Sequence, residues 1–162
     1  MLPFPIIKHK KTKYEAEILW YRVIDGDTVE CFLDLGFEHY TLVKVRIKGI
    51  DAPELKSKNP LEREAAGLVK ILMERFLEHS WNITTDQAKW DTHLVSYSID
   101  KDNRDRIIGD IMQTTGDYIS TDLLASRVVR SYSGDGKRSP WSDEELNAVI
   151  LAAKDILKTF KG

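Results

Sequence analysis

The sequence predicts a single α+β domain that is rich in β-structure. Its N-terminal part alternates apolar and polar residues, a pattern typical of half-buried strands. Two later segments carry apolar residues at helical spacing, each behind residues that cap helices. At 162 residues the chain has the length of one compact domain that buries a core. We therefore expect one domain over residues 1–162, in which residues 1–13 form a flexible basic N-terminal arm.

Three consecutive strands joined by short turns are expected first in the chain. Asp25 and Gly26 supply turn chemistry between the first two of them. The three predicted strands cover residues 14–24, 28–35 and 37–49.

The chain has one cysteine, Cys31, so no disulfide can form within it. Cys31 shares an alternating face with Val29, Leu33 and Leu35, and this position predicts a buried core thiol.

A long helix is expected from about residue 60 to about residue 79. Asn59 can cap it, Pro60 suits its first position, and Glu62 suits its first turn. Strands are expected next over residues 81–86, 94–99 and 106–112, followed by a short helix over residues 120–127.

The last helix begins with a capping box at residues 142–145. A stripe of apolar residues from Leu146 to Phe160 follows at helical spacing. We expect this stripe to pack into the core rather than to bind a partner.

The N-terminus places its charges after its apolar residues, which is the reverse of a signal peptide. No apolar run approaches the length of a membrane span. We expect a cytoplasmic monomer that makes no membrane contact, and secretion of a processed form of a longer precursor stays open.

Carboxylates and an arginine gather at two predicted strand ends. Asp27 lies just past the first turn, and Asp51 and Glu54 lie just past the third strand. Alternation in that strand places Arg46 and Lys48 on the face opposite its apolar residues, directed to solvent. Carboxylates bind calcium or magnesium, and the planar guanidinium suits phosphate oxygens. This combination predicts metal-assisted phosphodiester chemistry.

The two segments resemble the staphylococcal nuclease (thermonuclease) family. That family builds its active site from a D-G-D-T turn, found here at residues 25–28, and an R-x-x-G-[IV]-D-x-P-E segment, found here at residues 46–54. The resemblance implies an SNase-like domain with an OB-like five-stranded β-barrel and about three packed helices.

A third segment, residues 100–111, resembles the family's D-x-[YF]-G-R-x-L-[GA]-x-I element. Arg106 matches the second catalytic arginine of the family, but Arg104 and Asp105 stand where an aromatic residue and a glycine are usual. Either Arg104 or Arg106 is therefore the second phosphate clamp, and a third interpretation is that both only pair with nearby aspartates.

The resemblance also implies roles for individual residues. Catalytic roles fall on Arg46, Glu54 and Arg106, and metal ligation falls on Asp27, Asp51 and the backbone carbonyl of Ala52. Substrate contacts fall on Lys48, Arg104 and Tyr132.

Glu54 would either orient or deprotonate the attacking water. Tyr132 would either stack on a base or pack under the turn at residues 134–136. Asp25 and Thr28 are expected to support the site through hydrogen bonds.

The expected function is that of a calcium-dependent nuclease, with magnesium as a weaker substitute. It would hydrolyse DNA and RNA with little sequence specificity and leave 3′-phosphate and 5′-hydroxyl ends. The net charge of −2 predicts modest affinity for long nucleic acids. Two alternatives remain: a noncatalytic nucleic-acid-binding module on the same barrel, and a hydrolase of small phosphodiesters.

Overall fold

The computed structural model describes residues 14–82, 92–100, 103, 105–134 and 136–160. The predicted N-terminal arm, Arg104 and most of the strand predicted over residues 81–86 lie outside these ranges. No helix in the described part is long and apolar enough to cross a membrane.

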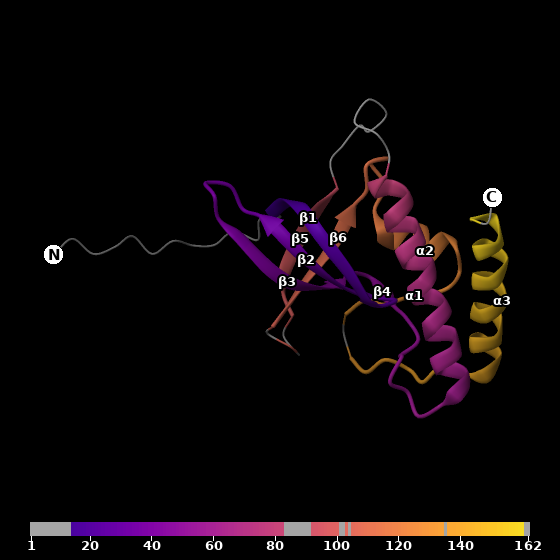
Figure 1. Ribbon diagram of the computed structural model, residues 1–162. Coiled ribbons are helices and arrows are strands. Elements are labelled where there is room, and N and C mark those ends of the chain that lie inside the picture. Colours follow the sequence, from indigo (N-terminus) through magenta and orange to yellow (C-terminus); the bar gives the residue numbers. More distant parts are fainter. Residues whose placement is uncertain (1–13, 83–91, 101–102, 104, 135, 161–162) are drawn as a thin grey trace.

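Five strands close into a barrel in the order β1-β2-β3-β6-β5 (Figure 1). The pairing of β3 with β6 is parallel, and the other pairings are antiparallel. The barrel strands are β1 (Tyr14–Asp25), β2 (Thr28–Asp34), β3 (Tyr40–Ile47), β5 (His93–Ile99) and β6 (Arg106–Met112). With its three helices this is an α+β, OB-like barrel, which confirms the predicted fold class.

The three helices of the described ranges lie on one side of the barrel, and α3 runs alongside α1 on the side away from the strands (Figure 1). The helices are α1 (Pro60–Trp81), α2 (Ile119–Ala125) and α3 (Asp143–Thr159). Asn59 caps α1 by accepting from the amide of Leu61, and the capping box predicted for α3 is present at Ser142 and Glu145.

Two helix boundaries differ from the prediction. Trp81, expected to begin a strand, is instead the last residue of α1. The short helix α2 ends at Ala125 rather than at Arg127, because Arg127 takes a left-handed conformation with φ of 58°.

The core fills the barrel and the space between the barrel and α1. Val29, Cys31 and Leu33 are buried as the alternation predicted, and burial raises the pKa of the Cys31 thiol to about 12. The prediction that Leu35 shares this buried face is wrong, because β2 ends at Asp34 and Leu35 is 55% exposed.

A second sheet of two very short strands was not predicted. It pairs β4 (Ile50–Asp51) with β7 (Arg130–Ser131) in antiparallel fashion. The amide of Tyr132 extends the pairing by donating to the carbonyl of Gly49 over 2.9 Å. This small sheet joins the segment after the barrel's third strand to the segment before α3.

Candidate active site

The β1–β2 turn fixes Asp27 at the edge of the barrel. The carboxylate of Asp25 closes the turn by accepting from the amide of Asp27 over 3.1 Å. The carbonyl of Asp27 accepts from the amide of Ile47 over 2.8 Å, which ties the turn to the end of β3. The Thr28 hydroxyl donates to Oδ1 of Asp27 over 3.1 Å. Asp25 and Thr28 thus form the supporting hydrogen bonds that the sequence suggested.

Gly26 is needed in this turn for space. A Cβ atom at this position would lie 2.7 Å from Cγ1 of Val69 in α1 and 2.8 Å from Cβ of Ala52. No side chain fits at those distances unless its neighbours move. The turn therefore packs directly against α1 and against the residue that follows Asp51.

Asp27 has a buried carboxylate with fixed partners. Its Oδ2 accepts from the amide of Ala52 over 3.1 Å and lies 3.4 Å from Nη2 of Arg46. Burial raises the pKa of Asp27 to about 6, although the Arg46 guanidinium works in the opposite direction. The charge of Asp25 nearby adds to the increase. A bound cation would favour the ionised form of this carboxylate.

Arg46 does not face solvent as the alternation of its strand predicted. Only 8% of the residue is exposed. Its Nη1 donates to the carbonyl of Ile47 over 3.0 Å, and its Nη2 donates to the carbonyl of Ile50 over 2.9 Å. The guanidinium is buried because these carbonyls and Asp27 satisfy it where the chain turns from β3 to β4. Arg46 therefore stabilises the turn between β3 and β4 and also pairs with the site residue Asp27.

Asp51 lies in β4 and is almost fully buried between two arginines. Its register partner in β7 is Arg130, whose Nη2 lies 2.6 Å from Oδ2 of Asp51. On its other oxygen, Oδ1, Asp51 accepts from Nη1 of Arg138 over 2.9 Å. Each carboxylate oxygen of Asp51 is thus bonded to a guanidinium.

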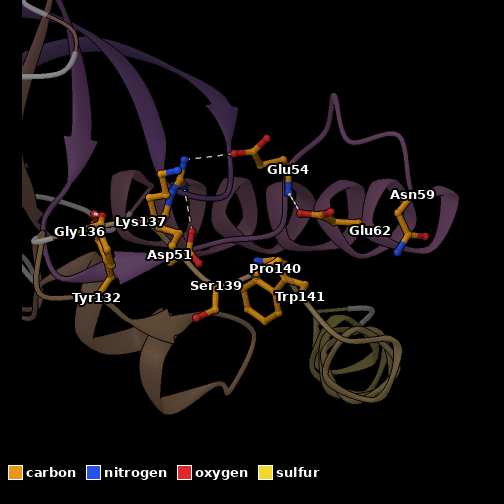
Figure 2. A pocket seen from close by; sticks show the side chains of 11 residues that line it. Asp51, Glu54, Asn59, Glu62, Tyr132, Gly136, Lys137, Ser139, Pro140 and Trp141 are labelled. Atoms are coloured by element: carbon orange, nitrogen blue, oxygen red, sulfur yellow. Dashed lines mark hydrogen bonds and ion pairs between the residues drawn. The ribbon is translucent and has the colours of Figure 1, made fainter.

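Arg138 also reaches the other two carboxylates of the site. Its Nη2 donates to Oε1 of Glu54 over 3.1 Å, and its Nη1 lies 4.0 Å from Oδ2 of Asp27. The amide of Glu54 is held by Oε1 of Glu62 in α1 over 3.1 Å (Figure 2). One guanidinium therefore bridges three carboxylates from two separate segments.

Two adjoining cavities open at this site. A cleft of about 350 Å³ is lined by five of the residues predicted for catalysis or metal binding: Asp27, Arg46, Ala52, Glu54 and Arg106. Asp51 lines the second cavity, of about 580 Å³, which lies between β4, the start of α1 and the segment from β7 to α3 (Figure 2). Glu54 and Arg138 line both cavities. The structure thus brings together the predicted catalytic residues Arg46, Glu54 and Arg106 in the cleft, whereas the predicted ligand Asp51 lines only the larger cavity.

Arg106 begins β6 and borders the cleft, but its guanidinium is paired. Its Nε donates to Oδ2 of Asp100 over 2.9 Å, and its Nη2 lies 2.7 Å from the same oxygen. Pairing with a nearby aspartate was one of the interpretations that the sequence left open for this residue. Arg104, the alternative second clamp, lies outside the described residues.

Two predicted substrate contacts lie at different places. Lys48 is exposed, and its ammonium lies 4.0 Å from the ring centroid of Tyr97 rather than in either cavity. Tyr132 lines the larger cavity (Figure 2). Its hydroxyl donates to the carbonyl of Gly136 over 2.9 Å. The Tyr132 hydroxyl therefore fastens the turn, and stacking of its ring on a base stays a prediction.

The donor chemistry of the site fits a divalent cation only in part. Asp27 and Asp51 are buried carboxylates, and hard oxygen ligands of this kind suit calcium. Within the described ranges, however, no group of three or more His, Cys, Asp or Glu residues is arranged to hold an ion. In this structure, the guanidiniums of Arg46, Arg130 and Arg138 neutralise the carboxylates. A cation would need at least one of these contacts to open.

The sequence did not indicate that Arg130 or Arg138 would meet Asp51. Both lie far along the chain from Asp51, and neither belongs to a periodic pattern. A weak signal was available in the cluster of turn and basic residues at positions 134–138. Only the pairing of β4 with β7 shows which acidic residue these arginines meet.

Comparison with protein-family models gives no match, and comparison with curated proteins gives none either.

Proposed function

We propose that the protein is a metal-dependent nuclease that hydrolyses phosphodiester bonds in DNA and RNA with little sequence specificity. The observation that carries this proposal is the cleft in which Asp27, Arg46, Glu54 and Arg106 meet from three separate segments. Carboxylates beside guanidiniums are the groups that phosphodiester hydrolysis needs, and the motifs resemble those of the staphylococcal nuclease family. That resemblance adds 3′-phosphate and 5′-hydroxyl products to the proposal.

In this proposal the arginines bind the reacting phosphate. Arg46 is fixed by two carbonyls and Asp27 and lines the cleft, so its guanidinium is held in place before a phosphate binds. Arg106 would turn from Asp100 to a phosphate oxygen, exchanging one charged partner for another. Two guanidiniums would then stabilise the charge that develops on the phosphoryl oxygens in the transition state.

Glu54 is the candidate group for the attacking water. Its side chain is 58% exposed and lines both cavities, so water has access to it. The hydrogen bond from its amide to Glu62 holds the backbone in place. Glu54 would orient the water or take its proton, and both roles are compatible with this position.

Asp27, Asp51 and the carbonyl of Ala52 are the groups that would hold a calcium ion, or more weakly a magnesium ion. Bound there, a divalent cation would supply positive charge beside the reacting phosphate. The amide of Ala52 bonds to Asp27, so the candidate ligands are already coupled through the backbone. Calcium tolerates irregular oxygen geometry better than magnesium, which favours calcium as the physiological ion.

A noncatalytic nucleic-acid-binding module on the same barrel is the second candidate. The observation that favours it is that both oxygens of Asp51 are already bonded to arginines. The guanidiniums at the site would then serve only as a phosphate-binding surface; they belong to Arg46, Arg106, Arg130 and Arg138.

The two candidates are separated by incubating the purified protein with closed circular DNA and single-stranded DNA in calcium, magnesium or chelator. We expect cleavage in calcium and none in chelator, and a Glu54→Gln variant should bind DNA but cleave it far more slowly. Binding without cleavage under every condition would support the module and contradict the nuclease.

A further inference from the structure

We propose that Arg138 is a tethered counter-ion that competes with the divalent cation for the carboxylates of the site. A cation would bind fully only when the Arg138 guanidinium leaves Asp51 and Glu54. This inference rests on the proposed metal-dependent function and adds a means by which the chain itself sets its affinity for the cation.

The first support is the position of the guanidinium. Its nitrogen atoms lie 2.9 Å from Asp51, 3.1 Å from Glu54 and 4.0 Å from Asp27. These contacts include both carboxylates that would ligate a cation. Calcium lies about 2.4 Å from its oxygen ligands, so an ion on the same oxygens would stand within a few ångströms of the guanidinium. Two such close positive charges repel each other, and one of them must withdraw.

The second support is the contrast between the two arginines that bind Asp51. Arg130 is anchored by other partners: it donates to the carbonyl of Ser139 over 2.7 Å, lies 3.7 Å from Glu145, and stacks 3.9 Å from the ring centroid of Trp141. The contacts of Arg138 within the described part of the chain are all with carboxylates of the site. Its side chain is also more exposed, at 38% against 23% for Arg130. Arg138 is therefore the arginine that can leave.

The third support is the charge of the site. Asp27, Asp51 and Glu54 contact the three guanidiniums of Arg46, Arg130 and Arg138, and Asp25 lines the same cleft. The site is thus nearly neutral before any cation binds. A divalent cation on these carboxylates would leave an excess of positive charge around Asp51, and displacement of the Arg138 guanidinium from Asp51 and Glu54 would reduce the repulsion there.

Withdrawal would not remove Arg138 from the site. Its side chain also lines the cleft that holds Arg46 and Arg106. A guanidinium released from Asp51 would therefore remain beside the place where a substrate phosphate is expected to bind, and it could serve there as a further phosphate donor.

The test is calcium binding by the free protein, measured by titration calorimetry in the absence of nucleic acid. We expect Arg138→Ala and Arg138→Gln to bind calcium about tenfold more tightly than the wild type, because a competing positive charge has been removed. Without calcium, both variants should unfold at a lower temperature than the wild type, since the carboxylates lose a partner. Saturating calcium should narrow that difference.

Lys137→Ala is the matched control. Lys137 lines the larger cavity beside Arg138, but it forms no ion pair with the described acidic residues. Its replacement by alanine removes one positive charge, as the Arg138 variants do. Its calcium affinity should stay within about twofold of the wild type, as expected for an exposed, screened charge.

Equal calcium affinity in the Arg138 variants and in Lys137→Ala would overturn the inference. If the wild type still cleaved DNA only in calcium, the proposed function would stand and only the competition would be wrong. If neither the wild type nor the Arg138 variants bound calcium, the inference and the metal-dependent function would both fail.

Discussion

Asp51 and Arg130 are direct partners in the pairing of β4 with β7, and their side chains meet over 2.6 Å although they lie 79 positions apart in the sequence. Backbone pairing and a charged hydrogen bond thus act at the same place. The contact joins the acidic segment after the barrel's third strand to the segment that leads into α3. This contact therefore stabilises both the site residue Asp51 and the position of the segment between β7 and α3.

Replacing Arg130 with alanine should destabilise the protein. Asp51 is buried, and loss of the guanidinium would leave its Oδ2 without this partner. We expect a loss of roughly 2–4 kcal/mol in the free energy of unfolding, measured by urea denaturation without metal. Arg22→Ala is the control, because the Arg22–Glu30 pair is exposed and should contribute about 1 kcal/mol or less. Equal effects of the two variants would contradict a structural role for Arg130.

Alanine variants of Arg46 and Arg106 should differ in how much stability they lose relative to cleavage activity. Arg46→Ala removes a buried donor to two carbonyls, so it should reduce stability by about 2 kcal/mol or more and also abolish cleavage. Arg106→Ala should slow turnover on the order of 10²-fold with a smaller loss of stability, since its guanidinium is more exposed. Denaturation and single-turnover cleavage on the same samples check both. Undiminished cleavage by Arg106→Ala would remove this residue from the mechanism.

Gly26→Ala should test the close packing of the β1–β2 turn against α1. The added methyl group would overlap Val69 and Ala52, and we expect a loss of about 1–3 kcal/mol. Gly67 in α1 offers a matched control, because a Cβ atom there meets nothing within 4 Å. Gly67→Ala should leave stability unchanged or raise it by up to about 1 kcal/mol. Gly26→Ala should therefore unfold at a lower temperature and urea concentration than the wild type, whereas Gly67→Ala should not.

Asp110 should make stability depend on pH. Burial raises the pKa of Asp110 to about 6, although it accepts hydrogen bonds from Ser120 and from the amide of Ile111. Between the ordinary pKa of 3.8 and this value, the folded state holds a proton that the unfolded state releases. Stability from this group is therefore present at low pH and is lost as pH rises through about 6.

Asp110→Asn cannot titrate and isolates this effect. The stability of the wild type relative to this variant should fall by roughly 1–3 kcal/mol between about pH 4 and pH 7. Urea denaturation at several pH values measures the difference. A constant difference over that range would contradict the raised pKa.

Much of the barrel could be predicted because its strands and long helices carry local signals. Alternation located β1 and β2, and capping residues located the starts of α1 and α3. The pairing of β4 with β7 could not be predicted, since two residues are too few to show a period.

The sequence predicted which residues line the cleft, but it did not predict which of them contact one another. Asp27, Arg46, Glu54 and Arg106 do line one cleft. The burial of Arg46 was missed because alternation assigns charged residues to solvent, whereas carbonyls of a turn satisfy this guanidinium. The meeting of Arg138 with Asp51 depends on how a long loop returns to the barrel, which no local pattern records.

The proposed function depends on a cation that the carboxylates of Asp27 and Asp51 would hold. The most direct measurement is the rate of cleavage of an end-labelled single-stranded oligonucleotide as a function of free calcium, with calcium binding titrated on the same protein. We predict a rate that saturates with the same calcium dependence as binding, and Asp51→Asn should lose both. Cleavage that persists in chelator, or a rate that does not follow calcium occupancy, would contradict the account.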